Sequence, residues 1–540
     1  MTNGRNVASI TAIIACALSA PAAIGAYSAQ ADELSDLRAN QQLLQQRLDQ
    51  LAQIPAPGAP YPGGPRAATA GAGIVGGSFP RSFLVPGTDT SIRVGGEIRE
   101  VFDYFFSGGN NNQGTPWSTT LGVNGQAQAI PLNIHVPVPI GTAGAVARAR
   151  SNSIFGQSPR ESKLYIETRT PTAWGEARTY MEFDWAGSTS SAPGGANPTS
   201  VSDNLHPRLR FAYATLGGLL AGQANSNFSD PDASSETIDF GGTFGDPGVV
   251  RVPQVRYTMP LAPYGFLGAF SVSAETPETD AWLPATGILG QDATSGSNPP
   301  ASVAPTGVNP LKTPAPDLTA AWYIPQPWGH FDVSAVVRPA MRISDGVFVD
   351  RTYTGWGIHQ GGDVKPHWFG WDRDGFTWHF VYGQAIGRYL NSSSGFALVT
   401  NYPAAIPASA GAAGNVLVKP TVSWGGNIGY RHYWLPNLRS TLSGGVWHHD
   451  INTNLRTVTA GGTTTATSAV CSNVGAPSPA QTGGGGCGLN KELINAHINL
   501  IWNPVPFADI GLEYTWAHRV VVSNLKGDMN ALIGRFRVQF

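Results

Sequence analysis

The chain has 540 residues, including 66 glycines and 42 prolines, and only 13% of them are charged, well below the ~25% usual for soluble domains. Aromatic residues make up 10%, which argues against intrinsic disorder, and the glycines lack the three-residue period of collagen. With 33 basic and 35 acidic residues the formal net charge is −2, which gives no attraction for a nucleic-acid backbone.

Residues 1–31 have the features of an export signal. Arg5 supplies a positive start, an apolar run follows, and the sequence Ala-Gln-Ala at 29–31 provides the small residues that precede a cleavage site. Cys16 lies in a stretch that loosely resembles a lipoprotein box, but the better cleavage site downstream favours simple export. Cleavage removes one basic and no acidic residue, so the mature net charge is −3, and two of the three cysteines remain.

Residues 32–54 carry a heptad pattern typical of a coiled coil. The a and d positions of three heptads hold five leucines and one glutamine, and Gln41 at an a position can fix the register. A lone amphipathic helix is the alternative, but so short a helix is marginal in water, which favours partner helices. The proline- and glycine-rich linker 55–78 then ends the helix and separates it from the segment 79–540.

From residue 79 onward apolar and charged residues alternate, as they do in strands whose two faces meet different surroundings. In residues 91–106, Ile98 and Phe102 share one face, and Arg99 and Asp103 share the other. The pattern predicts about sixteen strands, near residues 91–106, 161–170, 174–185, 208–216, 219–225, 250–258, 265–275, 317–325, 330–343, 351–362, 375–389, 418–434, 438–450, 490–502, 506–520 and 529–540.

Short turns and long loops alternate between these strands. The long loops lie near 107–160, 186–207, 226–249, 276–316, 390–417 and 451–489. A soluble β-sandwich has no reason to place its long loops only at every second connection. A membrane-spanning helix is also not predicted, because no run of 18 apolar residues follows the export signal. In lipid only a helix or a closed barrel satisfies every backbone amide. We therefore predict an all-β fold: a transmembrane antiparallel β-barrel of about 16 strands with a short N-terminal periplasmic coiled-coil helix.

Aromatic residues agree with this prediction. Several lie at or beside predicted short turns, as an interfacial girdle requires: Trp174, Trp328, Trp434, Trp502 and Phe507. The chain ends on Phe540 after an alternating apolar strand. This ending resembles the C-terminal signal that the barrel-assembly machinery reads in outer-membrane proteins.

Three motifs, together with this layout, resemble one family. They are SFLVPGTDTSIRVGGEIREVFDYFF at 82–106, NSNFSD at 225–230 followed by RVPQVRYTM at 251–259, and NPVPFADIGLEYTWAHR at 503–519. The sequence is similar to that of DcaP-like trimeric outer-membrane porins. The resemblance implies a sixteen-stranded barrel, a homotrimer, a periplasmic coiled coil and uptake of small organic acids such as dicarboxylates. Long inserts at 107–160 and 451–489 depart from the family and leave the solute open.

In such porins the third outer loop commonly folds inward and narrows the pore, and here that position is 226–249. This loop carries five acids and no base: Asp230, Asp232, Glu236, Asp239 and Asp246. Strand parity predicts lumen-facing arginines at Arg99, Arg169, Arg178, Arg208, Arg210, Arg256, Arg338, Arg342 and Arg535. It also predicts that apolar residues between them face lipid, among them Leu209, Phe211, Tyr213 and Met341.

An acidic loop opposite an arginine wall sets a transverse field, and an arginine fork can bind a carboxylate with two hydrogen bonds. The alternative is that these arginines are solvated charges, as any aqueous lumen contains, without a specific role in selectivity. We favour a functional role for Arg208, Arg210 and Arg256, which flank the loop, and we predict a preference for small anions. Two observations count against that preference: the loop acids can pair with the same arginines, and nearby acids neutralise part of their potential.

The sequence gives little support for other chemistry. His448 and His449 precede Asp450 at a strand end, but no third ligand has metal-site spacing, so we interpret them as solvated. The nucleophile motif G-x-S-x-G is missing, and Gly483–Gly486 lacks the Lys-Ser/Thr of a phosphate loop. We expect no cofactor and no enzyme. The predicted function is passive diffusion of small hydrophilic solutes, and an enzymatic or envelope-tethering barrel is the alternative.

We expect a homotrimer with a helical periplasmic stalk, because the leucine seam of 32–54 needs partner helices. Crosslinking of the detergent-extracted protein should give a species of three chains. A monodisperse monomer would contradict this prediction.

We expect Cys471 and Cys487 to form a disulfide, because both lie in one long loop of an exported chain. Closure of a loop of this size is worth about 3 kcal/mol in the chain-entropy model. The alternative is a pair of free thiols. Labelling of the native protein with a thiol reagent should modify neither cysteine until a reductant is added.

Overall fold

The computed structural model describes residues 75–107, 154–187, 206–247, 250–283, 287–289, 311–344, 349–390, 397–400, 418–451, 490–522 and 526–540. The chain divides into two units, Met1–Ala72 and Gly73–Phe540, and every described residue belongs to the second. The predicted export signal 1–31, the heptad segment 32–54 and most of the linker lie outside the described residues. The same holds for Cys471 and Cys487.

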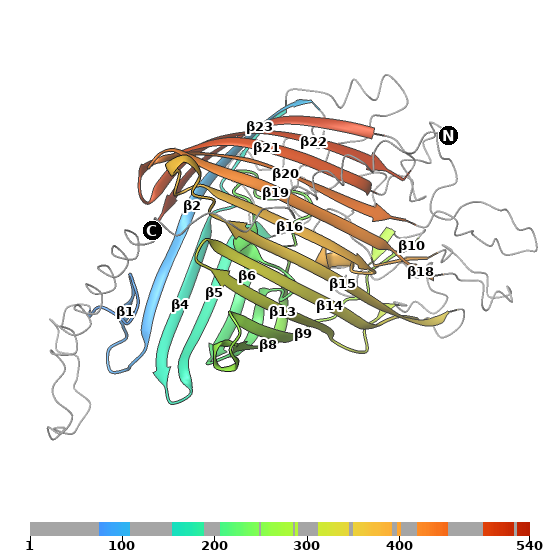
Figure 1. Cartoon of the computed structure of the whole chain (residues 1–540), viewed down its shortest axis with the longest axis horizontal. Helices are drawn as coiled ribbons and strands as arrows, with labels where there is room; N and C mark the ends of the chain where they lie inside the picture. The colour runs from blue at the N-terminus through green and yellow to red at the C-terminus, as the bar shows by residue number, and fades with distance from the viewer. Residues whose placement is uncertain are drawn as a thin grey trace, which may run out of the picture. The chain divides into compact units, whose positions relative to one another are not determined.

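Sixteen antiparallel strands close into a barrel (Figure 1). In chain order they are β2 (Ser91–Ser107), β4 (Lys163–Thr172), β5 (Gly175–Gly187), β6 (His206–Leu216), β7 (Leu219–Asn225), β8 (Arg251–Pro260), β9 (Ala269–Glu275), β13 (Asp317–Gln326), β14 (Gly329–Ser344), β15 (Asp350–Val364), β16 (Gly375–Gln384), β19 (Val422–Leu435), β20 (Leu438–Asp450), β21 (Asn490–Val505), β22 (Ala508–Val521) and β23 (Lys526–Gln539). Each strand pairs with the next in this order. The first and last strands pair as well, with Ile98 opposite Val538, so this sheet is closed.

Short strands extend or cover the barrel wall. β1 (Phe83–Leu84) and β3 (Ile154–Ser158) pair with the two ends of β2, and β12 (Leu311–Lys312) pairs with the end of β14. A separate four-stranded sheet joins two long-loop regions through β10 (Ala281–Leu283), β11 (Gly287–Leu289), β17 (Leu398–Thr400) and β18 (Val418–Pro420). The 3-10 helices are η1 (Pro231–Ala233), η2 (Ala262–Tyr264), η3 (Trp368–Gly370) and η4 (Gly387–Tyr389).

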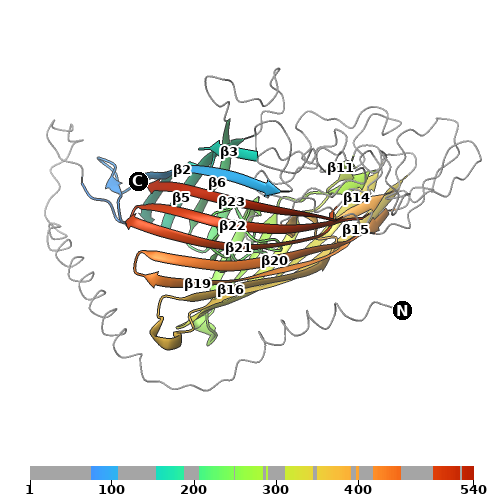
Figure 2. The same ribbon diagram turned by 90° about the horizontal axis from the view of Figure 1, so that it is seen from above.

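Each of the sixteen predicted strands corresponds to one barrel strand, so the predicted fold class is confirmed. Figure 2 shows β19, β20, β21, β22 and β23 next to one another in the barrel wall. The short turns lie at the end of the barrel where β23 and the chain end, which we call the short-turn end. Phe540 extends the closure there, since its backbone exchanges two hydrogen bonds with Gly96.

The two faces of the strands differ as the alternation predicts. On β2 the side chain of Ile98 is 56% exposed on the outer face, whereas Asp103 on the inner face is 0% exposed. A strand with such faces separates lipid from a polar interior. The predicted girdle residues Trp174, Trp328, Trp434, Trp502 and Phe507 are all exposed.

Two β-bulges overturn the predicted parity in parts of β6 and β14. On β6 the register shifts opposite Glu182 and Phe183, so that Phe211 and Tyr213 pair with the inward residues Glu182 and Tyr180. Phe211 and Tyr213 therefore face the lumen, not lipid. The extra residue of a bulge moves every later side chain of the strand to the opposite face.

The bulge on β14 lies between Arg338 and Met341. It turns Met341 inward, where it is 1% exposed, and it turns Arg342 to the outer face. Arg342 there pairs with Asp350 at 2.7 Å, and its side chain is 42% exposed. The prediction that Arg342 lines the pore is therefore wrong.

Among the described residues no helix is both long enough and apolar enough to cross a membrane.

Candidate functional site

Residues 226–247, which we call the crossing loop, run through the inside of the barrel. Near the start of the loop the backbone nitrogen of Asn227 donates to Glu275 of β9 at 2.8 Å. Further along, the backbone nitrogen of Ile238 donates to Glu513 of β22 at 2.7 Å. Because β9 and β22 lie far apart in the strand order, the loop spans the lumen.

The crossing loop packs on an apolar cluster inside the barrel. Phe228 and Phe244 of the loop are both buried, and the cluster also contains Val336, Val381, Ile386, Tyr389, Leu390, Trp447 and Leu493. Ile386 to Leu390 follow β16 and also turn inward. The cluster also includes Phe105 of β2, Ala517 of β22, and Met529 and Ala531 of β23, and Ile238 of the loop packs with Val101 of β2. Protein therefore fills the lumen beside β14 to β23 and β2, whereas these two clusters include no described residue of β4 to β8.

Acids of the crossing loop contact the protein-filled side of the lumen. Two of them bind residues of β14 and β20: Asp230 bonds His330 at 2.7 Å, and Glu236 pairs with Arg439 at 2.6 Å. Asp246 lies 3.6 Å from Nε2 of His379 of β16, too far for a hydrogen bond. Asp232 is exposed. These four acids form no ion pair with Arg208, Arg210 or Arg256 in the described part of the chain.

Burial and neighbours decide the charge of two of the loop acids. Burial raises the pKa of Glu236, but hydrogen bonds and charge from Arg439 outweigh it, so this pKa lies below its usual value. Burial raises the pKa of Asp239 well above its usual value, and the charge of Glu513 adds to the effect. Asp239 is therefore held toward its neutral form, and the charge of Glu236 is compensated locally.

Basic side chains cover the inner faces of the strands on the other side of the lumen. We call this set the basic wall: Arg93, Arg99, Lys163, Arg169, Arg178, Arg208, Arg210 and Arg256, from β2, β4, β5, β6 and β8. At the short-turn end three arginines share the buried carboxylate of Glu167, at 2.5 Å from Arg93, 2.8 Å from Arg169 and 2.7 Å from Arg178. Among the described residues, the half-exposed Glu176, 3.5 Å from Arg169, is the one further carboxylate that pairs with these arginines, so three positive charges face two negative ones.

The middle of the basic wall is compensated. Asp184 accepts both ends of the Arg208 fork at 3.0 and 2.6 Å. Arg210 is buried and bonds Glu182 at 2.7 Å and Asp184 at 2.9 Å. The structure thus brings Arg208 and Arg210 together as predicted, but each has a carboxylate of the wall itself as partner.

Arg256 differs from these pairs. No carboxylate lies within ion-pair distance of it among the described residues, and its Nε is buried without a hydrogen-bond partner. Arg251 at the start of the same strand is likewise without a carboxylate there, and its guanidinium lies 5.6 Å from the centre of the Phe211 ring. Among the described residues, these two arginines therefore combine hydrogen-bonding capacity with the lack of an ion-pair partner.

The crossing loop contacts the basic wall through an aromatic ring. The centre of the Phe240 ring lies 5.6 Å from the guanidinium of Arg99, 5.6 Å from the amine of Lys163 and 5.1 Å from the guanidinium of Arg210. Cations are attracted to the face of such a ring, so Phe240 holds the loop against the wall without cancelling its charge.

The remaining predicted arginines do not lie on the open lumen surface. Arg338 is 0% exposed and pairs with Asp280 at 2.9 Å and Asp317 at 3.3 Å beneath the segment that follows β16. Arg535 is buried and bonds Asp509 at 2.9 Å.

His449, predicted to be solvated, is wholly buried, and its ring stacks on Trp447 at 5.3 Å. No group of three or more His, Cys, Asp or Glu residues suited to a metal occurs in the described ranges.

A family model described as a porin subfamily matches residues 81–518. The chain belongs to the porin family. The outer-membrane channel DcaP of Acinetobacter baumannii has the same fold, with a TM-score of 0.56 and 21% identity over 86% of this chain and 100% of that chain. The resemblance drawn from the sequence motifs is thereby confirmed. Family and fold place this porin in the outer membrane, as a passive channel rather than an enzyme.

More distant solved porins also match. An anion-selective porin from Comamonas acidovorans has a TM-score of 0.41 and 8% identity over 84% of this chain and 100% of that chain. Salmonella typhi OmpF in complex with daunomycin has a TM-score of 0.42 and 8% identity over 84% of this chain and 98% of that chain. No curated protein sequence matches the porin.

Sequence reasoning missed three contributors to the lumen of this porin. Lys163 and Arg251 lie at strand starts, where parity is uncertain. Phe240 lies in a loop, and its contacts to β2, β4 and β6 have no local sequence signature.

The crossing loop passes close to the wall at Gly245. A Cβ atom there would lie 2.4 Å from both Gly426 N and Val446 O, whereas Gly242 has open space at the same left-handed φ. Ala at either position costs about 1 kcal/mol for the left-handed backbone. Gly245→Ala adds a steric clash that pushes the loop into the lumen, whereas Gly242→Ala does not. We therefore expect the single-channel conductance of the Gly245→Ala variant to fall and that of the Gly242→Ala variant to equal the wild-type value. Equal conductances in the two variants would contradict this placement of the loop.

Proposed function

We propose that this porin is a diffusion channel that favours small organic anions, with dicarboxylates as the solute class implied by the resemblance to DcaP-like porins. In this proposal the short-turn end and the N-terminal segment face the periplasm, the long loops face outward, and three chains assemble. The anion-selective Comamonas porin is too distant in fold to add support.

The observation that carries the proposal is the separation of charge across the lumen. Asp230 and Glu236 of the crossing loop bind His330 and Arg439, away from the basic wall, and Asp246 lies 3.6 Å from His379, so none of the three pairs with an arginine of the wall in the described ranges. The low-dielectric interior of a barrel strengthens the field of charges near the pore. A solute beside the basic wall therefore meets an excess of positive charge, although the mature chain as a whole is acidic.

Arg256 and Arg251 are the residues of this wall best suited to contact the solute. Arg256 or Arg251 can bind a carboxylate of the solute in the way that Arg208 binds Asp184, because an arginine fork binds a carboxylate with two hydrogen bonds. The arginines that are paired with carboxylates contribute to the electrostatic potential of the wall, and Arg256 and Arg251 offer free N–H donors to the solute. Such contacts are exposed to water and thus weak enough for release, as conduction requires.

We expect Arg256→Ala to lower the ratio of anion to cation permeability by about fivefold, because one charge about 8 Å away in water lowers the energy of an anion and raises that of a cation by about 0.5 kcal/mol each. The reversal potential of single channels under a salt gradient measures this ratio. Arg342→Ala is the matched control, because it removes the same charge from the outer face and should leave the potential unchanged. An unchanged potential in Arg256→Ala would refute the role of Arg256, and a cation-selective wild type would refute the proposed function.

A further inference from the structure

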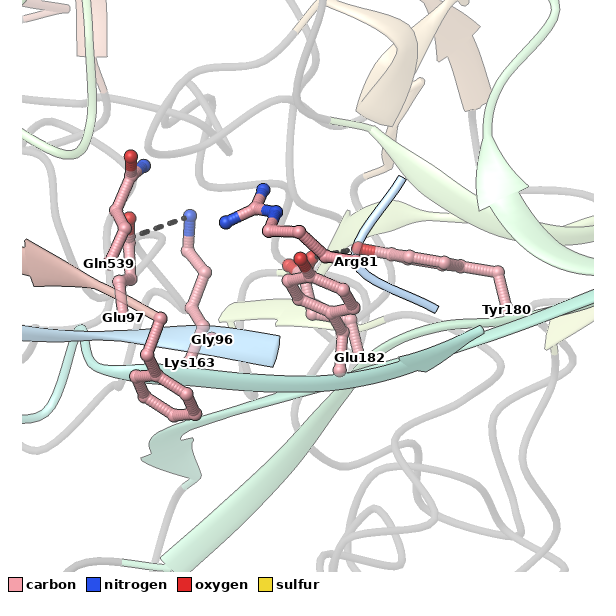
Figure 3. A pocket seen from close by; sticks show the side chains of 9 residues that line it. Arg81, Gly96, Glu97, Lys163, Tyr180, Glu182 and Gln539 are labelled. Carbon is pink, nitrogen blue, oxygen red and sulfur yellow. Dashed lines mark hydrogen bonds and ion pairs between the residues drawn. The ribbon is translucent and has the colours of Figure 1, made fainter. Parts of the chain in front are cut away.

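A cavity of about 170 Å³ lies at the short-turn end of the lumen, beside the closure of β2 on β23. It is lined by Arg81, Gly96, Glu97, Lys163, Tyr165, Tyr180, Glu182, Gln539 and Phe540. Figure 3 shows the amine of Lys163 and the guanidinium of Arg81 extending toward the same space, with Glu97 and Glu182 on either side. The amine of Lys163 also lies 5.6 Å from the centre of the Phe240 ring, so the cavity adjoins the crossing loop at Phe240.

The two carboxylates of the cavity already have partners. Glu97 bonds Arg99 at 2.7 Å, and the charge of Arg537 lies 3.6 Å away. Glu182 accepts hydrogen bonds from Arg210 at 2.7 Å and from the hydroxyl of Tyr180 at 2.6 Å. Both carboxylates are therefore engaged, although Arg99 is shared with Glu161 at 3.1 Å and Arg210 with Asp184 at 2.9 Å.

The hydrogen-bond donors that line the cavity, in contrast, have few or no acceptors. Arg81 has neither an ion pair nor a side-chain hydrogen bond in the described part of the chain, and the amine of Lys163 has only Glu97, at 3.4 Å. The hydroxyl of Tyr165 and the side-chain amide of Gln539 have no hydrogen-bond partner among the same residues. The terminal carboxylate of Phe540, although it belongs to a lining residue, forms no ion pair with Arg81 or Lys163. Donors without acceptors around one space are the requirement for binding an anion.

Arg81 is held in place by an unusual turn. Ser82 donates to the carbonyl of Phe79 at 3.1 Å across Pro80, and Arg81 at the third position has a φ of 59°. Glycine is the usual residue there, because a side chain at positive φ costs about 1 kcal/mol or more. Phe79 fixes the turn from inside: it is buried, and its ring centre lies 4.5 Å from Arg169 and 5.5 Å from Arg93. The backbone thus adopts a strained conformation that places a guanidinium at the cavity.

We infer that Arg81, Lys163, Tyr165 and Gln539 form a binding site for the carboxylate group of a solute that has passed Phe240. The inference rests on the proposed anion preference and adds a second station at the end of the pore. It also makes the segment 75–84, which precedes the barrel, part of the selectivity machinery. Inorganic phosphate offers the same acceptor chemistry, and the experiment below separates it from a carboxylate.

The test measures the binding of succinate and, separately, of inorganic phosphate to the purified full-length porin in detergent by calorimetry, for the wild type, Arg81→Gly and Lys163→Gln. We expect each variant to weaken binding by about fivefold, the loss of one solvated charge-assisted contact. Arg81→Gly should also unfold at the same or a higher temperature, because glycine relieves the positive φ. Arg373→Gly is the control: it removes one charge from an exposed position in the turn before β16 and should bind succinate as the wild type does.

Succinate affinities within twofold of wild type in both variants would overturn the site. A loss of phosphate binding alone, with succinate unchanged, would overturn its assignment to a carboxylate. Both results are independent of the reversal potential: a cation-selective wild type refutes the proposed function, whereas an anion-selective channel with unchanged succinate binding refutes only this station.

Discussion

The fold depends on one constraint: a backbone amide without a partner in lipid costs several kcal/mol. The pairing of β2 with β23, extended by the exchange between Phe540 and Gly96, removes the last open edge and satisfies this constraint. Closure in turn gives every strand one face toward lipid and one toward the lumen. Away from the strand ends, where Arg342 pairs with Asp350 on the outer face, charged side chains lie on the inner face. The inner faces are therefore dense with arginine and carboxylate.

It follows that an arginine in the lumen is not by itself evidence of selectivity. The partners of each arginine carry the information. Arg338 and Arg535 are buried in ion pairs and stabilise the packing of inward segments, whereas Arg256 and Arg81 have no carboxylate among the described residues. An unpaired charge that faces water keeps its hydrogen-bonding capacity, while a buried pair has lost it to its partner.

The strand pattern could be predicted from the sequence because barrel strands alternate with a period of two along their whole length. The prediction failed where a bulge adds a residue: Phe211, Tyr213 and Met341 turn inward, and Arg342 turns outward. Composition does not mark these bulges. The inward position of the crossing loop could be expected from the resemblance, but its partners could not, since Ile238 and Glu513 are 275 positions apart. Contacts of this kind are set by closure and not by local pattern.

The crossing loop has two tasks that its acids cannot perform together. A loop that spans a lumen needs fixed points, and Asp230 and Glu236 provide them by binding His330 and Arg439. Carboxylates used in this way are compensated where they lie, and screening beyond ~8 Å at physiological salt further limits their reach. The contact with the basic wall is left to Phe240, which attracts cations through its ring and brings no charge of its own. In the proposed channel, Phe240 would thus narrow the pore without adding negative charge, while Asp230 and Glu236 stay anchored on other strands.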